Sequence, residues 1–453
     1  MSFLRTAALL ALSFAGPIAA QQVYFGNLHS HTSYSDGSGK PAEAYQFARN
    51  NAKVDFLMIS EHNHSQAEDG ASTDRRDGIL IAKDHSLYTG PARTSLIPAA
   101  RKSSLNGKFL GLYGQEFSSI SKGNHVNVFD VDTVIDVPNG DFAGLVSWMT
   151  QHHDSLGQPP ILQFNHPELF DNKATEYGAD DFASPSEWIQ KIGAFARLIE
   201  IVAGPAMTKV PAEVPKDAED EFLRYLNLGF RVAPTADQDN HYKTWGNASP
   251  ARTGVIADEL TKPAILGALR NRHVYATEDS NLRLVFKVQN RLMGDVIAPT
   301  LTAGQELDIS VSIHDDDEPQ AHYEIDVLSD SAPGGATARV IDTVSVDGNT
   351  TAPVRIEDVT FTGKGQYLFF RVRQIGEDRV DRAWTSPVWF DDAEVSPVVP
   401  PVDTVAIASR LSRTYHTSPD CVDAQRIKPT NRIEGDEARR GRLPHEGCPR
   451  RQQ

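Results

Sequence analysis

Cysteine is scarce in this sequence: Cys421 and Cys448 are its two cysteines, and both lie near the C-terminus. A disulfide framework therefore cannot hold the main body of the chain together. Positive charge is also lacking, since the formal net charge is −16, which argues against wholesale binding to nucleic acid or to an anionic membrane. Beyond the first twenty residues, no segment is long and apolar enough to cross a bilayer. A chain of 453 residues that is 40% hydrophobic must instead bury a large core, in roughly two to four domains.

The first segment, residues 1–20 (MSFLRTAALLALSFAGPIAA), has the pattern of a secretory signal peptide, with one Arg, an apolar run and a small-residue end. Cleavage is expected after Ala20. An uncleaved membrane anchor is the alternative, but the apolar run is shorter than the about 20 residues that a span needs. The sequence therefore predicts an exported protein, periplasmic or extracellular.

Residues 21–280 alternate between segments typical of strands and segments typical of helices. Strands are indicated at 23–26, 55–60, 109–117, 125–131, 159–167, 197–204, 230–236, 251–257 and 273–277, and helices at 41–54, 142–153, 186–195, 216–229 and 262–272. Strands that alternate with helices imply a parallel sheet. The length and the number of units suit a closed barrel, in which the carboxyl ends of all strands share one rim.

The period changes to two in residues 281–395, where short segments such as LRLVFKV and QYLFFRVRQ are separated by Gly, Asp and Asn turns. This pattern predicts a small β-sandwich. A Pro-rich linker, 396–403, follows. The remaining residues, 404–453, contain 10 Lys and Arg against 6 Asp and Glu, in contrast to the acidic rest of the chain. This change of sign marks a separate small basic module.

Potential metal ligands stand at the ends of the predicted strands in residues 21–280. They are His29, His31, Asp36, Glu61, His62, His64, Glu116, His125, His166, Glu200, Asp237, Asp239 and His241. One barrel rim would bring these side chains together. Without cations, the negative charges of these carboxylates would repel one another at the rim. The simplest way to balance them is a cluster of two or three divalent metal ions.

The ordered motifs "NLHSHTSYSDG", "ISEHNH", "GQEFS", "GNHVNV", "FNHPE" and "DQDNH" resemble the polymerase and histidinol phosphatase (PHP) superfamily. More narrowly, they are similar to its exported branch, which includes carbamate-ester hydrolases such as carbaryl hydrolase. The resemblance covers residues 23–280 and implies a distorted (β/α)7 TIM-like barrel with two or three Zn, Mn or Fe ions. The sequence departs from the family pattern at Glu61, because the family usually has an Asp before this histidine.

The resemblance also implies how the ligands divide among the ions. The first set would be His29, His31, Glu116 and Asp239; the second Asp36, His62 and His241; and the third Glu116 as a bridge, His125 and His166. Asp237 is an extra carboxylate, and Asp239 is preferred because it occupies the Asp-x-His position. Glu200 is expected to orient a ligand histidine. His152 and His153, at the end of a predicted helix, are expected to be structural or solvated.

Two or three divalent ions would make a bridging hydroxide available near neutral pH, and this hydroxide would attack phosphorus or an acyl carbon. His64 could protonate the leaving group, unless it is a solvated loop histidine. Arg252 could bind a phosphate oxygen, unless it forms a surface salt bridge. Glu61 is the third candidate catalytic residue, as an orienting group or a ligand.

The C-terminal module contains four residues of the types that bind zinc in proteins, namely His416, Cys421, His445 and Cys448. It resembles the small metal-binding module of bacterial DNA-alkylation repair proteins, although His445 stands where that module has a cysteine. A Cys421–Cys448 disulfide competes with zinc and is favoured by export.

The expected function is that of an exported metal-dependent hydrolase, with phosphoester hydrolysis preferred and carboxylic or carbamate ester hydrolysis as the alternative. A second alternative is a non-catalytic envelope-binding protein with structural metals, although structural sites are usually closed mononuclear centres. The expected partner is a small-molecule ester, with neither nucleic acid nor a membrane span in the mature protein. Substrate, metal and oligomeric state stay open at this stage.

Overall fold

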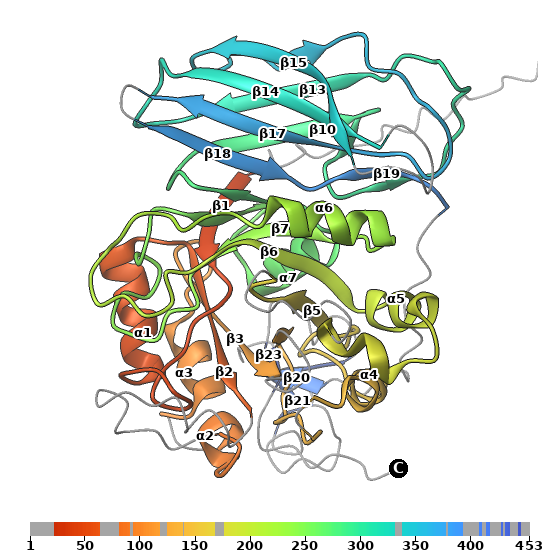
Figure 1. The fold of residues 1–453 in the computed structure, drawn as a ribbon. Coiled ribbons are helices and arrows are strands. Elements are labelled where there is room, and N and C mark those ends of the chain that lie inside the picture. The colour runs from red at the N-terminus through yellow and green to blue at the C-terminus, as the bar shows by residue number, and fades with distance from the viewer. Residues whose placement is uncertain are drawn as a thin grey trace, which may run out of the picture.

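The computed structural model describes residues 22–63, 81–90, 94–117, 125–138, 140–167, 176–330, 338–376 and 379–392. It also describes short pieces of the C-terminal region at 407–409, 414–416, 427–428, 431–434 and 443–444. Figure 1 shows an α/β part that contains the first strands and helices, and above it a part made of strands alone. The expected signal peptide, 1–20, lies outside the described residues.

The α/β part is organised by one curved sheet. Its strands are β1 (Gln22–Asn27), β2 (Phe56–His62), β3 (Leu110–Phe117), β4 (Val126–Phe129), β5 (Ile161–Phe164), β6 (Ala196–Ala203), β7 (Ala233–Asp237), β8 (Arg252–Ala257) and β9 (Val274–Thr277). The hydrogen-bonded order is β9-β8-β1-β2-β3-β4-β5-β6-β7. Most of these strands are buried along their whole length, as expected for near-continuous apolar runs covered on both faces.

The expectation of a wholly parallel, closed barrel is wrong in two respects. First, β4 runs antiparallel to both β3 and β5, and β8 runs antiparallel to both β1 and β9. The connection from β3 to β4 is too short for the crossover of a dozen or more residues that parallel neighbours require. Second, no backbone ladder joins β7 to β8 within the described residues, so the sheet is not a closed barrel. The fold is a mixed α/β arrangement around one large sheet.

Helices pack around this sheet. They are α1 (Pro41–Phe47), continued by a π-helical turn (Ala48–Ala52), α2 (Ser86–Thr89), α3 (Leu96–Ser103), α4 (Phe142–Gln151), a 3-10 segment (Glu176–Asp181), α5 (Pro185–Gly193), α6 (Glu219–Leu228) and α7 (Lys262–Arg270). Several begin with the expected signals, because Ser184 and Thr261 cap α5 and α7 with their side chains and a Pro follows each cap. Their apolar faces are buried in the core.

The upper part in Figure 1 consists of two sheets facing each other. One contains β10 (Arg283–Val288), β11 (Arg291–Leu292), β13 (Ile309–His314) and β16 (Val354–Ile356), and the other contains β12 (Val296–Ile297), β14 (His322–Ser329), β15 (Arg339–Asp347), β17 (Tyr367–Ile375), β18 (Val380–Thr385) and β19 (Val388–Phe390). Alternate residues of β10 and β13 are buried between the sheets. Phe286 of β10 stacks on Phe370 of β17, with ring centroids 4.1 Å apart.

The two parts share backbone hydrogen bonds and charged contacts. β18 pairs with β9, so the second sheet of the upper part continues into the sheet of the α/β part. Arg371 of β17 donates to Glu219 of α6 at 2.7 Å and to Asp326 of β14 at 2.8 Å. Trp384 of β18 also donates to Glu219, at 2.7 Å. The expected domain boundary at residue 280 therefore falls between strands of neighbouring, connected sheets.

The described C-terminal pieces form a small sheet of β20 (Ile407–Ser409), β21 (Thr414–His416), β22 (Arg432–Glu434) and β23 (Leu443–Pro444). Cys421, His445 and Cys448 lie outside the described residues, as does the side chain of His416. The zinc site and the competing disulfide therefore stay predictions. Within the described part of the chain, no helix combines the length and the apolar character needed to cross a membrane.

Candidate metal centre

The first two histidines of the cluster follow β1 directly. Gly26 lets β1 lie close to β2, because a Cβ at this position would come within 2.3 Å of the Phe56 ring. Beyond Asn27 the chain continues toward the end of β7, where the backbone N–H of His31 donates to the carbonyl of Asn240 at 2.7 Å. This connection places His29 and His31 beside Asp239.

Four donor atoms from His29, His31, Glu116 and Asp239 converge. The Nε2 atoms of His29 and His31 lie 3.2 Å apart. Asp239 Oδ1 lies 3.1 Å from the first nitrogen and 3.0 Å from the second. Glu116 places Oε1 3.3 Å from His29 Nε2 and Oε2 3.1 Å from His31 Nε2. Four ligands held about 2.0–2.1 Å from a tetrahedral zinc ion lie about 3.3–3.4 Å apart, so this spacing fits one divalent ion.

Two further donor sets adjoin the first. His31, Asp36, His62 and His241 form one, and His62, Glu116 and His125 form the other; within each set all ligand atoms lie within 4.8 Å of one another. His166 Nε2 lies 3.2 Å from Glu116 Oε1. The structure thus brings together every histidine and carboxylate that the resemblance assigns as a ligand. It places His31 also in the second set, and His62 beside Glu116 and His125 in the third.

Buried carboxylates and histidines give the cluster donor atoms that could hold cations. Glu116 Oε2 and Asp239 Oδ1 are buried and accept no hydrogen bond from the residues that the structure describes. Burial raises the pKa of Glu116 and of Asp239, but the neighbouring histidines outweigh this effect and hold both pKa values well below the ordinary range. Burial lowers the pKa of His31, yet its contacts with Asp239 and Glu116 raise it to about 10. The cluster therefore demands positive charge, as protons or as metal ions.

His62 differs from His31 in its protonation. Burial is the largest influence on its pKa and lowers it to about 3. A neutral imidazole has a lone pair to offer to a metal. Its two ring nitrogens point to different carboxylates: Nδ1 lies 3.1 Å from Glu116 Oε2 and Nε2 lies 3.7 Å from Asp36 Oδ2. His62 can therefore serve either adjoining donor set.

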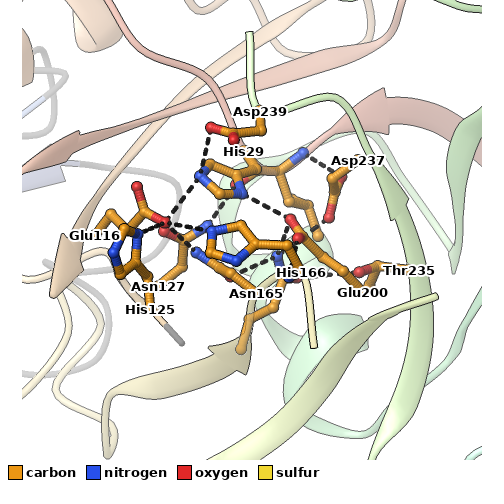
Figure 2. A network of polar contacts seen from close by, with 12 residues as sticks. His29, Glu116, His125, Asn127, Asn165, His166, Glu200, Thr235, Asp237 and Asp239 are labelled. Carbon is orange, nitrogen blue, oxygen red and sulfur yellow. Dashed lines mark hydrogen bonds and ion pairs between the residues drawn. The ribbon is translucent and has the colours of Figure 1, made fainter. Parts of the chain in front are cut away.

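Glu200 contacts the ring nitrogen of His29 that faces away from the other ligands, as expected of an orienting residue. Figure 2 shows its carboxylate on the side of His29 that faces away from Asp239. Glu200 Oε1 lies 2.7 Å from His29 Nδ1, and Glu200 Oε2 accepts from the backbone N–H of His166 at 2.7 Å. A carboxylate at Nδ1 fixes the tautomer in which Nε2 carries the lone pair. One side chain of β6 thus orients two candidate ligands.

Asp237 lies beneath the cluster and is not among the donor sets. Its Oδ1 accepts from the backbone N–H of Leu28 at 2.6 Å, and Gln163 donates to Oδ2 at 3.1 Å. Burial and the nearby charge of Glu200 raise the pKa of Asp237 to about 7. The preference for Asp239 over Asp237 as a ligand agrees with this geometry.

Glu61, the candidate catalytic residue that departs from the family pattern, is fully buried next to the loop after His31. Its carboxylate accepts hydrogen bonds from the Thr32 side chain, from the Thr32 backbone N–H at 3.1 Å and from Ser35 Oγ at 2.5 Å. Ser35 Oγ lies 3.4 Å from His31 Nδ1. Burial raises the pKa of Glu61 to about 6. This position suits an orienting group.

Of the other two candidate catalytic residues, the structure describes Arg252 but not His64. Arg252 begins β8, is buried, and donates from Nη1 to the carbonyls of Ser249 and Ala251 at 2.8 Å. Burial lowers its pKa to about 10. His64 lies outside the described residues. Outside the cluster, His152 stacks on Trp148 with ring centroids 3.8 Å apart. The catalytic roles of Glu61, His64 and Arg252 stay predictions.

Amide side chains that the sequence analysis missed complete the network. Asn165 donates to Glu116 Oε1 at 3.0 Å, and Gln163 lies between Glu200 and Asp237. Asn127 of β4 is fully buried nearby and labelled in Figure 2. A signal was available, because Gln163 in β5 and Asn165 directly after it are polar residues on either side of Phe164, and residues two apart in an extended segment point to one face.

Two candidate ligands also have an unusual backbone. His166 has φ 33° and Asp239 has φ 47°, in the left-handed region that is uncommon for residues other than glycine, although His and Asp occupy it more often than most. Backbone strain of this kind persists where the surrounding structure imposes it, and it concentrates at functional sites. The donor sets themselves form a buried His/Asp/Glu cluster that could hold divalent metal ions.

Comparisons with known proteins give distant likenesses. No protein-family model matches the chain. An uncharacterized protein of Chlamydia pneumoniae is 26% identical over a match of 224 residues that covers 44% of this chain and 34% of that relative. The chain therefore spans about a third of the length of this relative. A solved two-domain protein from Bacteroides vulgatus, which contains a predicted PHP-like metal-dependent phosphoesterase, matches over 78% of this chain and 90% of its own, with 14% identity and a TM-score of 0.39. The functional argument therefore depends on the geometry of the cluster.

Proposed function

We propose that this chain is an exported metal-dependent hydrolase of the PHP type, related to the carbaryl-hydrolase-like branch, and that it hydrolyses phosphoesters. The observation that carries the proposal is the convergence of donor atoms from His29, His31, Glu116 and Asp239: the two Nε2 atoms lie 3.2 Å apart, and each lies 3.0–3.3 Å from one oxygen of Glu116 and from Asp239 Oδ1. The two adjoining donor sets support a centre of two or three ions, of zinc, manganese or iron. A single closed structural site would not need the adjoining sets.

Divalent ions at this centre would supply Lewis acidity and an activated water near neutral pH. The chain's own residues hold the ligands in place. Glu200 fixes the His29 tautomer, and Glu61 holds the loop that carries Asp36 through Thr32 and Ser35. In this proposal His64 donates a proton to the leaving group and Arg252 faces the substrate's anionic oxygen from the start of β8.

The test is hydrolysis of p-nitrophenyl phosphate and p-nitrophenyl acetate by the purified full chain, before and after chelation and with Mn²⁺ or Zn²⁺ restored. Phosphate hydrolysis that chelation abolishes and metal restores supports the proposal. Metal-dependent turnover of the acetate alone would reassign the chain to carboxylic or carbamate ester hydrolysis. Bound metal with turnover of neither substrate would favour an envelope-binding protein with structural metals. In each of these assays, elemental analysis measures the number of metal ions per chain.

A further inference from the structure

Asn165 lies within the cluster but belongs to none of its donor sets (Figure 2). It follows β5 directly and is fully buried, and its Nδ2 donates to Glu116 Oε1 at 3.0 Å. An amide nitrogen is a hydrogen-bond donor whatever the protonation state of its neighbours, and it is not a metal ligand here. Its contact with Glu116 therefore differs in kind from the contacts that histidines make with the same carboxylate.

Three further hydrogen bonds fix the position of Asn165. Its backbone N–H donates to the carbonyl of His125 at 3.1 Å, and its own carbonyl accepts from the Tyr177 hydroxyl at 2.6 Å. Gln163 Nε2 donates to Asn165 Oδ1 at 3.4 Å. Because Oδ1 faces a donor, the amide nitrogen is the end that faces the carboxylate of Glu116. The backbone and both ends of this side chain are therefore held in place.

Among the described residues, Glu116 is the one carboxylate that two donor sets share. Each of its oxygens faces one histidine of each set. Oε1 lies 3.3 Å from Nε2 of His29 in the first set and 3.0 Å from Nδ1 of His125 in the third. Oε2 lies 3.1 Å from Nε2 of His31 and 3.1 Å from Nδ1 of His62, again one from each set. A rotation of this carboxylate would therefore disturb both sets at once.

The carboxylate of Glu116 does not keep this orientation by its own preference. The last torsion of a glutamate side chain is broad, so the contacts of the carboxylate decide its plane. The other described side chains in polar contact with its oxygens are histidines. A ring nitrogen that gives its lone pair to a metal ion cannot donate a proton to Glu116 at the same time. Asn165 is thus the described neighbour that stays a donor to this carboxylate with and without metal.

We infer that Asn165 is a positioning residue that couples the metal ions of the first and third donor sets, because it fixes the carboxylate of Glu116 that both sets share. The inference rests on the proposed function in placing divalent ions at these sets. With Asn165 present, Glu116 keeps one oxygen toward each histidine pair when the first ion binds. Without Asn165, the carboxylate is free to turn toward the ion that binds first, and the last ion is held weakly.

The test measures metal binding, so it does not depend on turnover. Zn²⁺ is titrated into the metal-free full chain in competition with a chromophoric chelator, and the successive Kd values are compared with those of Asn165→Leu, a variant of similar size without the donor. We expect the Kd of the most weakly bound ion to rise about 10- to 100-fold, as for loss of a partner that orients a ligand, and the Kd of the tightest ion to change far less. Asn165→Ser, whose side chain is too short to reach Glu116, should behave in the same way. Gln366→Leu, at a buried amide of the β-sandwich, is the matched control and should keep every Kd.

A spectroscopic measurement separates positioning from a merely structural role. Electron paramagnetic resonance of the chain saturated with Mn²⁺ should show magnetically coupled ions, and both Asn165 variants should weaken that coupling. Urea denaturation of the metal-free proteins shows which variants fold, and if one does not fold, the other decides.

The outcomes also separate Asn165 from the proposed reaction. The expected changes in a chain that hydrolyses neither ester would support the positioning role and reject the proposed function. Equal weakening of every ion, unchanged Kd values, unchanged magnetic coupling, a single bound ion in the original chain, or loss of the fold in both variants would overturn the inference, even in an active phosphoesterase.

Discussion

The Nε2 atoms of His29 and His31 lie 3.2 Å apart in a fully buried position, and both face the carboxylates of Glu116 and Asp239. Two imidazole lone pairs at this distance repel each other unless a proton or a metal ion lies between them. The carboxylates add negative charge to the same small volume. This pair of nitrogens is therefore the part of the cluster most dependent on a cation.

His31→Ala should remove at least one metal ion per chain, because His31 belongs to two donor sets. Hydrolytic activity should fall at least about a hundredfold, since the ions supply the activated water. Elemental analysis and p-nitrophenyl phosphate turnover measure the two effects. His322→Ala, at a histidine on the β-sandwich that contacts Asp347, is the control and should keep both. Full metal content and activity in the His31 variant would contradict the site assignment.

Glu200→Gln should weaken metal binding about 10- to 100-fold, because the carboxylate 2.7 Å from His29 Nδ1 would be lost. Asp237→Asn should have a smaller effect: the pKa of Asp237 is raised to about 7, so this carboxyl is already partly neutral near pH 7. Competition with a chromophoric chelator measures both affinities. Equal effects of the two variants would show that Glu200 does not act through His29.

Gly37→Ala should disturb the loop between His31 and Asp36, since an added Cβ would lie 2.7 Å from the carbonyl carbon of His31. We expect a loss of about 1–3 kcal/mol in the free energy of unfolding, together with reduced metal content. Gly267→Ala in α7 is the matched control, because a Cβ there meets nothing within 4 Å. That variant should gain about 0.5–1 kcal/mol. Urea denaturation and elemental analysis distinguish the two, and a Gly37 variant with unchanged stability and metal would disprove the close approach.

Asp279 makes stability depend on pH. Burial, aided by the charges of Asp315 and Asp381, raises its pKa to about 6. The folded state therefore binds this proton more tightly than the unfolded state, and the resulting stability is present below about pH 4 and is lost as pH rises through about 6. Asp279→Asn should keep the hydrogen bonds from the Asn281 and Leu282 N–H groups. Its free energy of unfolding relative to the original chain should thus increase between pH 5 and pH 7.5. Urea denaturation across that range measures this difference, and a constant difference would contradict it.

Much of the candidate site could be predicted from the sequence, because its ligands stand at strand ends and strand ends gather at a sheet rim. The resemblance to the PHP superfamily, and not the strand ends, grouped His29, His31, Glu116 and Asp239 as one set, and the structure brings their donor atoms together. His125 lies at the same rim although it precedes a strand and does not follow one. It opens an antiparallel strand, whose first residues lie next to the last residues of β3. The short segment between Glu116 and His125 was the sequence signal for this arrangement.

The closed barrel could not be predicted correctly from the alternation of strands and helices, because alternation does not record strand direction. The reversal of β4 and β8 depends on connection length and on partners distant in sequence. The amides of Gln163 and Asn165 were missed although their spacing was a sequence signal, because their hydrogen-bond partners Asp237 and Glu116 lie on other strands. The roles of the C-terminal cysteines depend on residues outside the described part.

The pairing of β9 with β18 means that the β-sandwich continues the sheet of the α/β part, which holds the candidate metal ligands. A chain ending after Thr277 would leave β9 as an exposed edge strand, whose unpaired N–H and C=O groups could pair with another chain and cause aggregation. It would also strip Glu219 of the contacts from Arg371 and Trp384. The β-sandwich therefore protects the edge of β9 and holds α6 in place, so we expect the α/β part to lose stability without it.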